Sequence, residues 1–467
     1  MPACQYIGGL ITEPYDVIIV GGGVTGTALA YTLSRYTNAK RLLLIEKYSD
    51  IATLNSNGIN NAQTLHVGDV ETNYSLEESK HVKESASKLS RYAAMLPEEE
   101  RGRVIQPCQK MVLGVGDNEV KVLEGKYDDL KTIFPGLKKI GRAELEKIEP
   151  NTIKGRDPKE SVLALLSDTG YMMNFGLLAK SFLSRAEDSK QVRLDVKLNT
   201  KALSVKAAQL GHSVVTNNGT FEGRFVVFAA GTYSLYFAKQ IGYNENLSIL
   251  SVGGGFYVTP RVLNGKVYRV EEGGIPFAAV HGDPDITDPN ITRFGPTVNV
   301  PLELEVRKPG TFMDYMKTFN KDLATAESLL KILGNKDISR ILRLNISYKI
   351  PAIGQYLFLK HEAARIVPSL KYSDLKFDRR VGGIRPQIID ENLKSFTLGA
   401  SKIRGEGMLF IITPSPGASS SLQSALDDTM HIAERIGLRF DRERCESELG
   451  PINDEHLRIK AQQHKQM

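Results

Sequence analysis

Three glycines near the start of the chain have the spacing of a phosphate-binding turn. Gly21, Gly23 and Gly26 form the pattern GxGxxG, and Gly22 and Thr25 lie inside it. The first glycine permits a tight turn, the second lets the backbone approach a pyrophosphate, and the third lets a helix pack on the preceding strand. The amino end of that helix also stabilises phosphate charge. The pattern predicts a site for a dinucleotide.

An acidic residue stands where the ribose of a dinucleotide would need one. Glu46 follows an apolar, β-rich run over positions 41–45. It comes about 20 residues after the last glycine, which is the spacing of a ribose contact. Its neighbour Lys47 belongs to the same expected site. The alternative is a glycine turn with an incidental acid, but a strand over positions 16–20 and a helix over 27–36 frame the turn and favour the dinucleotide site.

Two later motifs of small residues favour FAD over NAD. A buried strand over residues 225–228 ends in Ala229, Ala230 and Gly231. Small residues there let another backbone segment approach the same cofactor, and a simple strand end followed by a tight turn is the alternative. Near the carboxyl end, residues 414–419 open a helix that is expected to run to about residue 436. Its first backbone N–H groups could stabilise negative charge on a reduced flavin, and its serines could also act as N-caps.

The elements that must position these motifs are spread along the chain. Helices are expected over residues 77–91, 119–133, 171–186 and 312–333, and strands over residues 192–198 and 203–207, followed by a hairpin at Asn218-Gly219. Because the glycine motifs lie early, in the middle and late, we predict an α/β protein with discontinuous domains. The FAD-binding domain is expected to contain residues 1–75, 150–235 and 376–445, the substrate domain residues 76–149 and 236–375, and the tail residues 446–467.

Composition limits the class of protein. The chain has 467 residues and a hydrophobic content of 41%, and this length is more than one compact core usually holds. No apolar run approaches the roughly 20 residues of a membrane-spanning helix. Residues 1–9 lack the features of a secretory signal. Three cysteines without CxxC spacing indicate a reducing compartment, no disulfide framework and no structural zinc, and no other metal-ligand spacing appears. The net charge of +6 is compatible with an anionic membrane or acidic substrates.

Four segments resemble the malate:quinone oxidoreductase family, in family order. They are residues 60–66 (NNAQTLH) with 71–74 (ETNY), 276–283 (PFAAVHGD) with 294–296 (FGP), 383–387 (GIRPQ) and 413–419 (TPSPGAS). The resemblance covers residues 14–437 and extends more loosely to L-2-hydroxyglutarate dehydrogenases and D-amino-acid-oxidase-like flavoproteins. It implies a glutathione-reductase-like FAD-binding domain of the Rossmann type and a discontinuous, mixed-sheet α+β substrate domain.

The resemblance also assigns candidate roles. His281 is the leading general base, with a structural role at a strand end as its alternative. His66 is a second candidate base or a structural residue at the flavin edge. Arg385 would bind a substrate carboxylate in a bidentate manner, or else brace the flavin or a loop. Malate has a second carboxylate, for which Arg293, Arg380, Arg404 and Lys110 are candidates. The expected cofactor-binding residues are Gly21, Gly22, Gly23, Thr25, Gly26, Glu46, Lys47, Asn61, Gln63, Thr64, His66, Ala202, Ala230, Gly231, Arg385, Pro416, Gly417, Ala418 and Ser419.

The implied reaction is oxidation of L-malate to oxaloacetate, with hydride transfer to flavin N5 and electrons passed to a membrane quinone. A dehydrogenase or oxidase for L-2-hydroxyglutarate or another 2-hydroxy acid is the alternative. A non-catalytic or RNA-modifying flavoprotein is a third class. The chain has no tryptophan and no tract that interleaves basic and aromatic residues, which argues against binding of nucleic acid.

A quinone is lipid-soluble, so the enzyme is expected to lie peripherally on the inner face of an energy-transducing membrane. That face would be the cytoplasmic side in a bacterium, or the mitochondrial inner membrane in a eukaryote. Residues 331–360 contain six basic residues and one acid among many apolar ones, a composition that suits an interfacial element. An ordinary amphipathic cover on the substrate domain is the alternative for this stretch.

Overall fold

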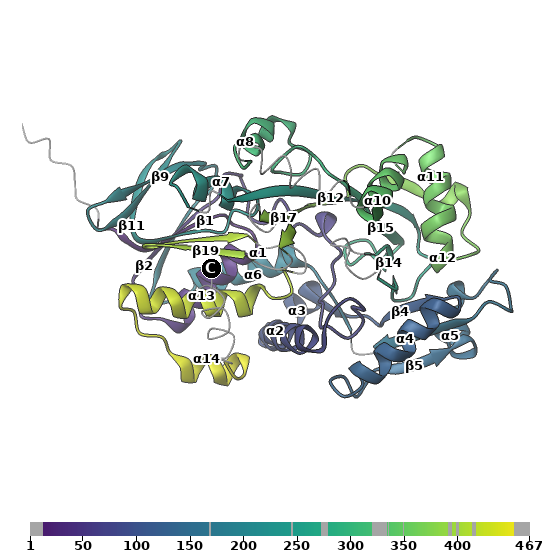
Figure 1. The fold of residues 1–467 in the computed structure, drawn as a ribbon. Coiled ribbons are helices and arrows are strands. Elements are labelled where there is room, and N and C mark those ends of the chain that lie inside the picture. The colour runs from purple at the N-terminus through teal and green to yellow at the C-terminus, as the bar shows by residue number, and fades with distance from the viewer. Residues whose placement is uncertain are drawn as a thin grey trace, which may run out of the picture.

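Two large sheets organise the part of the chain that the computed structural model describes (Figure 1). The described residues are 13–167, 170–243, 246–271, 279–319, 334, 336–348, 350–390, 395–397, 401–412 and 417–452. No helix among them is long and apolar enough to cross a membrane.

The first sheet has eight strands and carries the dinucleotide turn. Its central strand β1 lies between β2 and β11, and all three are parallel. Strand β20 extends the parallel set beyond β11, and β8 extends it beyond β2. The residues of β1 from Val17 to Val20 are all apolar and buried, because both faces of the sheet are covered. The strands are β1 (Tyr15–Val20), β2 (Arg41–Ile45), β8 (Arg193–Lys197), β9 (Ala202–Ala208), β10 (Gly211–Thr216), β11 (Gly219–Phe228), β19 (Ser401–Gly405) and β20 (Met408–Ile412).

Helices from three distant parts of the chain pack on one face of this sheet. Helix α1 contacts both α6 and α13, and α13 in turn contacts α2. Figure 1 shows α13 and α14 on the same side of the sheet. Helix α2 begins in a capping box between Ser75 and Glu78, a local signal that fixes its start. The helices are α1 (Val24–Tyr36), α2 (Leu76–Ala94), α3 (Glu98–Val104), α6 (Phe175–Glu187), α13 (Ser421–Ile436) and α14 (Arg442–Leu449); α7 (Tyr233–Gln240) lies on the other face.

The second sheet has ten strands and mixed directions. Its long strand β12 pairs antiparallel with both β15 and β17, while β13 pairs parallel with β4. Helix α10 contacts β15, and α4 contacts β4 and β6. The strands are β4 (Lys110–Val115), β5 (Lys138–Gly141), β6 (Val162–Ser167), β12 (Leu247–Pro260), β13 (Lys266–Arg269), β14 (His281–Pro284), β15 (Ile291–Asn299), β16 (Lys376–Asp378), β17 (Ile384–Asp390) and β18 (Ser395–Thr397). The helices are α4 (Asp117–Leu130), α5 (Arg142–Ile148), α8 (Phe312–Met316), α10 (Lys336–Ser347), α11 (Ile353–Phe358) and α12 (Ala364–Ile366).

The sheets divide the chain differently from the expected domain boundaries. Strands β6 and β16–β18 were expected in the FAD-binding domain but pair within the second sheet. Helix α2 was expected in the substrate domain but packs in the core of the first sheet. The helix expected over residues 171–186 begins as strand β7 (Tyr171–Met173), because these residues pair with β3 (Ile105–Pro107); α6 starts only after the N-cap Asn174. The helix expected over residues 312–333 lies within the described residues only as far as 319, and α8 is its helical part there.

Candidate active site

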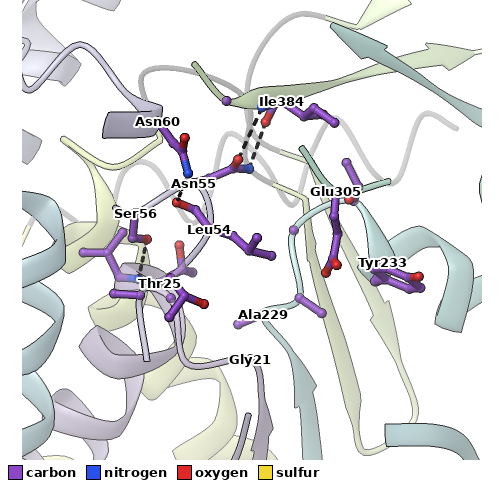
Figure 2. A pocket seen from close by; sticks show the side chains of 18 of the residues that line it. Gly21, Thr25, Leu54, Asn55, Ser56, Asn60, Ala229, Tyr233, Glu305 and Ile384 are labelled. Atoms are coloured by element: carbon purple, nitrogen blue, oxygen red, sulfur yellow. Dashed lines mark hydrogen bonds between the residues drawn. The ribbon is translucent and has the colours of Figure 1, made fainter. Parts of the chain in front are cut away.

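A cavity of about 350 Å³ opens at the carboxyl ends of the parallel strands of the first sheet and reaches the second sheet. In open α/β sheets this edge is where ligands bind. Figure 2 shows Gly21 and Ala229 at its foot, Glu305 and Tyr233 on one side, and Asn55 and Ser56 on the other. Of the predicted residues, the lining includes Gly21, Gly23, Thr25, Glu46, Lys47, Asn61, Gln63, Thr64, His66, Ala202, Ala230, Gly231, Arg385, Gly417, Ala418 and Ser419.

The glycine turn is shaped by close backbone contacts. Gly21 has φ +114°, and a Cβ there would lie 2.4 Å from the carbonyl oxygen of Ala229. A Cβ on Gly26 would lie 2.0 Å from the carbonyl oxygen of Gly21, so this glycine serves the packing of helix on strand. Gly23 precedes the first residue of α1, and its backbone faces the cavity. The turn therefore presents main chain at a helix amino end, the arrangement that binds a pyrophosphate.

Glu46 is held in place by the turn itself. Its Oε2 accepts a hydrogen bond from the Gly22 amide (2.8 Å), and its Oε1 accepts one from the Tyr48 amide (3.0 Å). Burial raises the pKa of Glu46, and these two hydrogen bonds oppose that shift. Each carboxylate oxygen has a second lone pair, so the group can still accept hydrogen bonds from ribose hydroxyls. Neither Gly22 nor Gly26, both predicted to bind the cofactor, belongs to the described lining of the cavity. Gly22 contributes to the site indirectly, through its hydrogen bond to Glu46.

A second acid completes this end of the cavity and was not expected from the sequence. Glu305 forms an ion pair with Lys47 and accepts a hydrogen bond from the Tyr48 hydroxyl (2.7 Å). The Lys47 ammonium also lies 4.5 Å from the centre of the Tyr233 ring. No local motif marks Glu305, because it follows a different sheet and meets Lys47 only in the folded chain.

The polar segment at residues 61–64 is fastened by its own side chains. Gln63 has φ +52°, a left-handed conformation that is unusual for a residue other than glycine. Its side-chain amide donates to Asp285 Oδ2 (3.2 Å) and accepts from the Ile286 amide (2.8 Å). Asn61 donates to the carbonyl oxygens of Asn55 and Asn57. These bonds hold the segment against the cavity in one conformation.

His66 lies in the cavity wall with a carboxylate behind it. Its Nδ1 is 2.6 Å from Oε1 of the buried Glu71, and its backbone amide donates to the Ser419 hydroxyl (3.0 Å). Burial alone would raise the pKa of Glu71, but the hydrogen bond to His66 and the nearby Lys110 ammonium outweigh it and hold this pKa at about 2. Lys110 itself bonds to Asp69 (2.6 Å). Glu71 was not among the predicted site residues.

His281 does not belong to the described lining of the cavity. Its side chain is almost fully buried, with 2% of the residue exposed. One ring nitrogen faces the Ala279 carbonyl oxygen (3.2 Å), and the other lies 3.0 Å from Asp283 Oδ2. Tyr268 stacks on the imidazole, with 4.7 Å between ring centres, and its hydroxyl shares a hydrogen bond with the Thr64 hydroxyl (2.8 Å). Of the two histidines, His66 belongs to the described lining of the cavity and His281 does not, whereas the sequence ranked His281 first.

Arg385, on β17, brings a partly buried cation to the cavity. Burial lowers its pKa, while the surrounding Tyr268, Glu271 and Tyr74 raise it. Among the described residues, no carboxylate lies within ion-pair distance of its guanidinium. Glu271 is itself unusual, because burial and the charge of Glu71 raise its pKa to about 7. An arginine without a fixed carboxylate partner can accept one from a ligand.

The candidates for a second carboxylate-binding cation lie elsewhere. Arg293 is fully buried and 3.2 Å from Asp285, and Lys110 bonds to Asp69. Arg380 is exposed and pairs with Asp378 (2.8 Å), and Arg404 is exposed on β19. None of the four belongs to the described lining of the cavity. Pro416, predicted to bind the cofactor, lies outside the described residues, as does part of the segment 276–283.

This combination of a parallel sheet, a glycine turn and a cavity at the sheet edge is that of an α/β FAD-binding fold. The chain is similar to the glycine oxidase of Geobacillus kaustophilus (TM-score 0.62, 18% identity, 91% of this chain and 96% of that one). It is also similar to the L-alpha-glycerophosphate oxidase of Mycoplasma pneumoniae solved with FAD bound (TM-score 0.62, 19% identity, 92% and 96%). At such low identity the likeness establishes the fold alone.

Sequence comparison is more specific. The family model described as "Malate:quinone oxidoreductase (Mqo)" matches residues 13–432. The malate:quinone oxidoreductase of Helicobacter pylori is 37% identical over 451 residues, covering 94% of this chain and 98% of that protein. The chain therefore belongs to the malate:quinone oxidoreductase family, as its four motifs indicated.

Proposed function

We propose that the chain oxidises L-malate to oxaloacetate with FAD as the cofactor and a quinone as the electron acceptor. The observation that carries the proposal is the continuity of one cavity, which runs from the glycine turn to His66 and Arg385. Membership of the family supports the choice of malate and quinone. The enzyme would act at the inner face of an energy-transducing membrane, where a lipid-soluble quinone is found.

The described residues fit FAD. The backbone of the glycine turn would hold the pyrophosphate, and Glu46 the adenosine ribose, in a domain of the glutathione-reductase type. Residues 417–419, in the turn just before α13, would direct backbone N–H groups toward the ring. When bound, the flavin supplies the hydride acceptor at N5. What remains for the protein is to orient the substrate and remove one proton.

We assign proton removal to His66. A neutral imidazole that donates its Nδ1–H to Glu71 keeps a lone pair on Nε2, which can accept the proton of the malate 2-hydroxyl. Loss of that proton accompanies loss of the C2 hydrogen as hydride, so two electrons leave and the alcohol becomes a ketone. The ionised Glu71 then stabilises the imidazolium that forms.

Arg385 would hold the carboxylate next to the reacting carbon. A guanidinium can form two parallel hydrogen bonds to a carboxylate, and this fixes the direction of the C2–H bond. Tyr74, Tyr268 and Glu271 surround the guanidinium, and burial makes its charge more effective than it would be in water.

Anaerobic reduction of the purified, FAD-loaded protein tests the proposal. L-Malate should bleach the flavin faster than D-malate, L-lactate or L-2-hydroxyglutarate, and a quinone analogue should restore the colour faster than oxygen. Preferential bleaching by L-2-hydroxyglutarate would assign the chain to the related dehydrogenases instead. Bleaching by none of these hydroxy acids would remove the proposed activity.

A further inference from the structure

The stretch that combines basic and apolar residues, expected as an interfacial element or as a cover on the substrate domain, is divided by the fold into two faces. Phe358 is fully buried and stacks on Tyr257 with 4.3 Å between ring centres. Leu344 and Leu357 pack against the same core. The Asn345 side chain accepts a hydrogen bond from the Val298 amide (2.6 Å) and fastens α10 to β15. This inward face explains why the two helices stay on the second sheet.

The outward face of this stretch is also apolar, although its side chains do not contribute to the core of the second sheet. Its exposed side chains form what we call the isoleucine surface, with exposed fractions of 61% for Ile346, 47% for Ile350, 58% for Ile353, 54% for Tyr356 and 42% for Tyr372. The Tyr372 hydroxyl donates to the Ala352 carbonyl oxygen (3.2 Å), and Gln355 donates to the Tyr372 carbonyl oxygen (2.7 Å). These two bonds join Tyr372 to the turn before α11 and to α11 itself, so Tyr372 lies beside the exposed residues of this segment. Figure 1 shows α10 and α11 together at one corner of the molecule, far from the hairpin of β9 and β10.

Basic residues lie at the edge of the isoleucine surface. Arg343 precedes Ile346 by one helical turn, and Lys360 follows Tyr356 by one, so each cation shares a face with the apolar residues. Lys371 is exposed next to Tyr372. The neighbouring acid Glu362 is bound to Arg269 instead and accepts a hydrogen bond from the Tyr348 hydroxyl (3.0 Å). The patch is thus apolar at its centre, and its edge carries the three cations Arg343, Lys360 and Lys371 together with one acid, Asp374, two residues after Tyr372.

We propose that the isoleucine surface is the face with which the protein lies on an anionic lipid membrane. Apolar side chains bordered by lysine and arginine suit the boundary between acyl chains and acidic headgroups. This inference rests on the proposed function, since a quinone dissolved in lipid gives the enzyme a reason to be at a membrane. We favour lipid over a second copy of the chain as the partner of this surface. In a dimer formed through the surface, the cations at the edges of the two copies would face and repel each other.

Vesicle flotation of the full, FAD-loaded chain tests the inference. Wild-type protein should float with vesicles of phosphatidylcholine and phosphatidylglycerol, and less with phosphatidylcholine alone. The double variant Ile350→Asp/Ile353→Asp should bind about tenfold more weakly or worse, the order expected for one buried isoleucine. Arg343→Glu/Lys360→Glu should lose the preference for anionic lipid. Leu210→Asp, an exposed leucine between β9 and β10, is the matched control and should bind as wild type does.

Two activity measurements separate this inference from the proposed function. With L-malate and a water-soluble short-chain quinone, Ile350→Asp/Ile353→Asp should keep the wild-type rate. With a long-chain quinone in vesicles, the same variant should lose activity in proportion to its loss of vesicle binding. Unchanged flotation of Ile350→Asp/Ile353→Asp, or of the milder Ile350→Ser/Ile353→Ser, would overturn the inference. So would a wild-type dimer that these variants dissociate without any change in flotation. Vesicle binding by a protein inactive on malate would instead contradict the proposed function alone.

Discussion

Tyr268 has ring contacts with both histidines that were candidates for the base. One face of its ring covers His281, and its hydroxyl group bonds to Thr64 on the cavity side, while His66 lies at 6.4 Å between ring centres. His281 is therefore positioned to fix the tyrosine, with Asp283 fixing the histidine in turn. His66, unlike His281, belongs to the described lining of the cavity, which is why we propose it as the base.

The two histidines should respond differently to the same substitution. We expect His66→Gln to slow flavin reduction by L-malate about 100-fold or more, the usual contribution of a general base. His281→Gln should keep most of that rate and instead lower the melting temperature, because it leaves Asp283 without its imidazole partner. Stopped-flow reduction and thermal unfolding of both FAD-loaded variants measure the two effects. A slower reduction in His281→Gln, with FAD fully bound, would restore His281 as the base.

Glu271 should make stability depend on pH near neutrality. Burial raises its folded-state pKa from 4.5 to about 7, so the folded protein holds this proton more tightly than the unfolded chain does. The stabilisation is complete below about 4.5 and is lost as the pH rises through about 7. Glu271→Gln removes the ionisable group. The melting temperature of this variant, measured relative to that of wild type, should therefore be higher at pH 8 than at pH 5. The exposed Glu124→Gln is the control, and an equal difference at both pH values in Glu271→Gln would contradict the shift.

At the scale of elements, the strand–turn–helix unit depends on one glycine that faces no ligand. A Cβ at Gly26 would meet backbone, which cannot move aside as a flexible side chain could. Gly26→Ala should consequently lose FAD and melt at a lower temperature. Gly125→Ala, in the open interior of α4, should be neutral or stabilising by about 0.5–1 kcal/mol. Flavin absorbance and thermal unfolding distinguish the two, and full FAD occupancy in Gly26→Ala would show that the turn tolerates a methyl group.

The elements that sequence could predict are those whose signals are local. The boundaries of β2 match the expected run, and α1 begins within the glycine pattern. Residues 171–173 were expected in a helix but form β7, because pairing with a strand far away in sequence overrides the helical pattern. The same limit applies to the site. Gly21, Glu46 and Arg385 belong to motifs. Glu71 begins the ETNY segment, but its contact with His66 could not be predicted from the motif alone, and Glu271 and Glu305 acquire their surroundings only when distant segments meet.

At the scale of the whole molecule, the cavity joins the two sheets. Asn55 illustrates this link, because its side chain donates to the Ile384 carbonyl oxygen (2.8 Å) and accepts from the Ile384 amide (3.3 Å) (Figure 2). A cofactor that contacts both walls should stabilise the folded state as a whole.

Removal of FAD should therefore lower the melting temperature of the entire protein in one transition. Restoring FAD to about 100 times its dissociation constant should add about 2.7 kcal/mol to the free energy of unfolding. FMN should restore much less, since it lacks the adenosine that Glu46 is placed to bind. Differential scanning calorimetry of apoprotein titrated with each flavin provides the measurement. Equal stabilisation by FMN would contradict the assignment of Glu46.

The positions of the lining residues along the chain also determine how early during synthesis the cavity can form. Its lining starts at Val20 and is complete only with Ser419, and β20 must insert beside β11 after the whole of the second sheet's long strand has been made. The ribosome has to synthesise all residues up to Ser419 before a cofactor finds its complete binding site. Until then the parallel sheet is missing a strand, and its apolar edge along β11 is open to pairing with other nascent chains. We therefore expect the cofactor to bind after β20 and residues 417–419 have been synthesised, and not during elongation of the earlier segments.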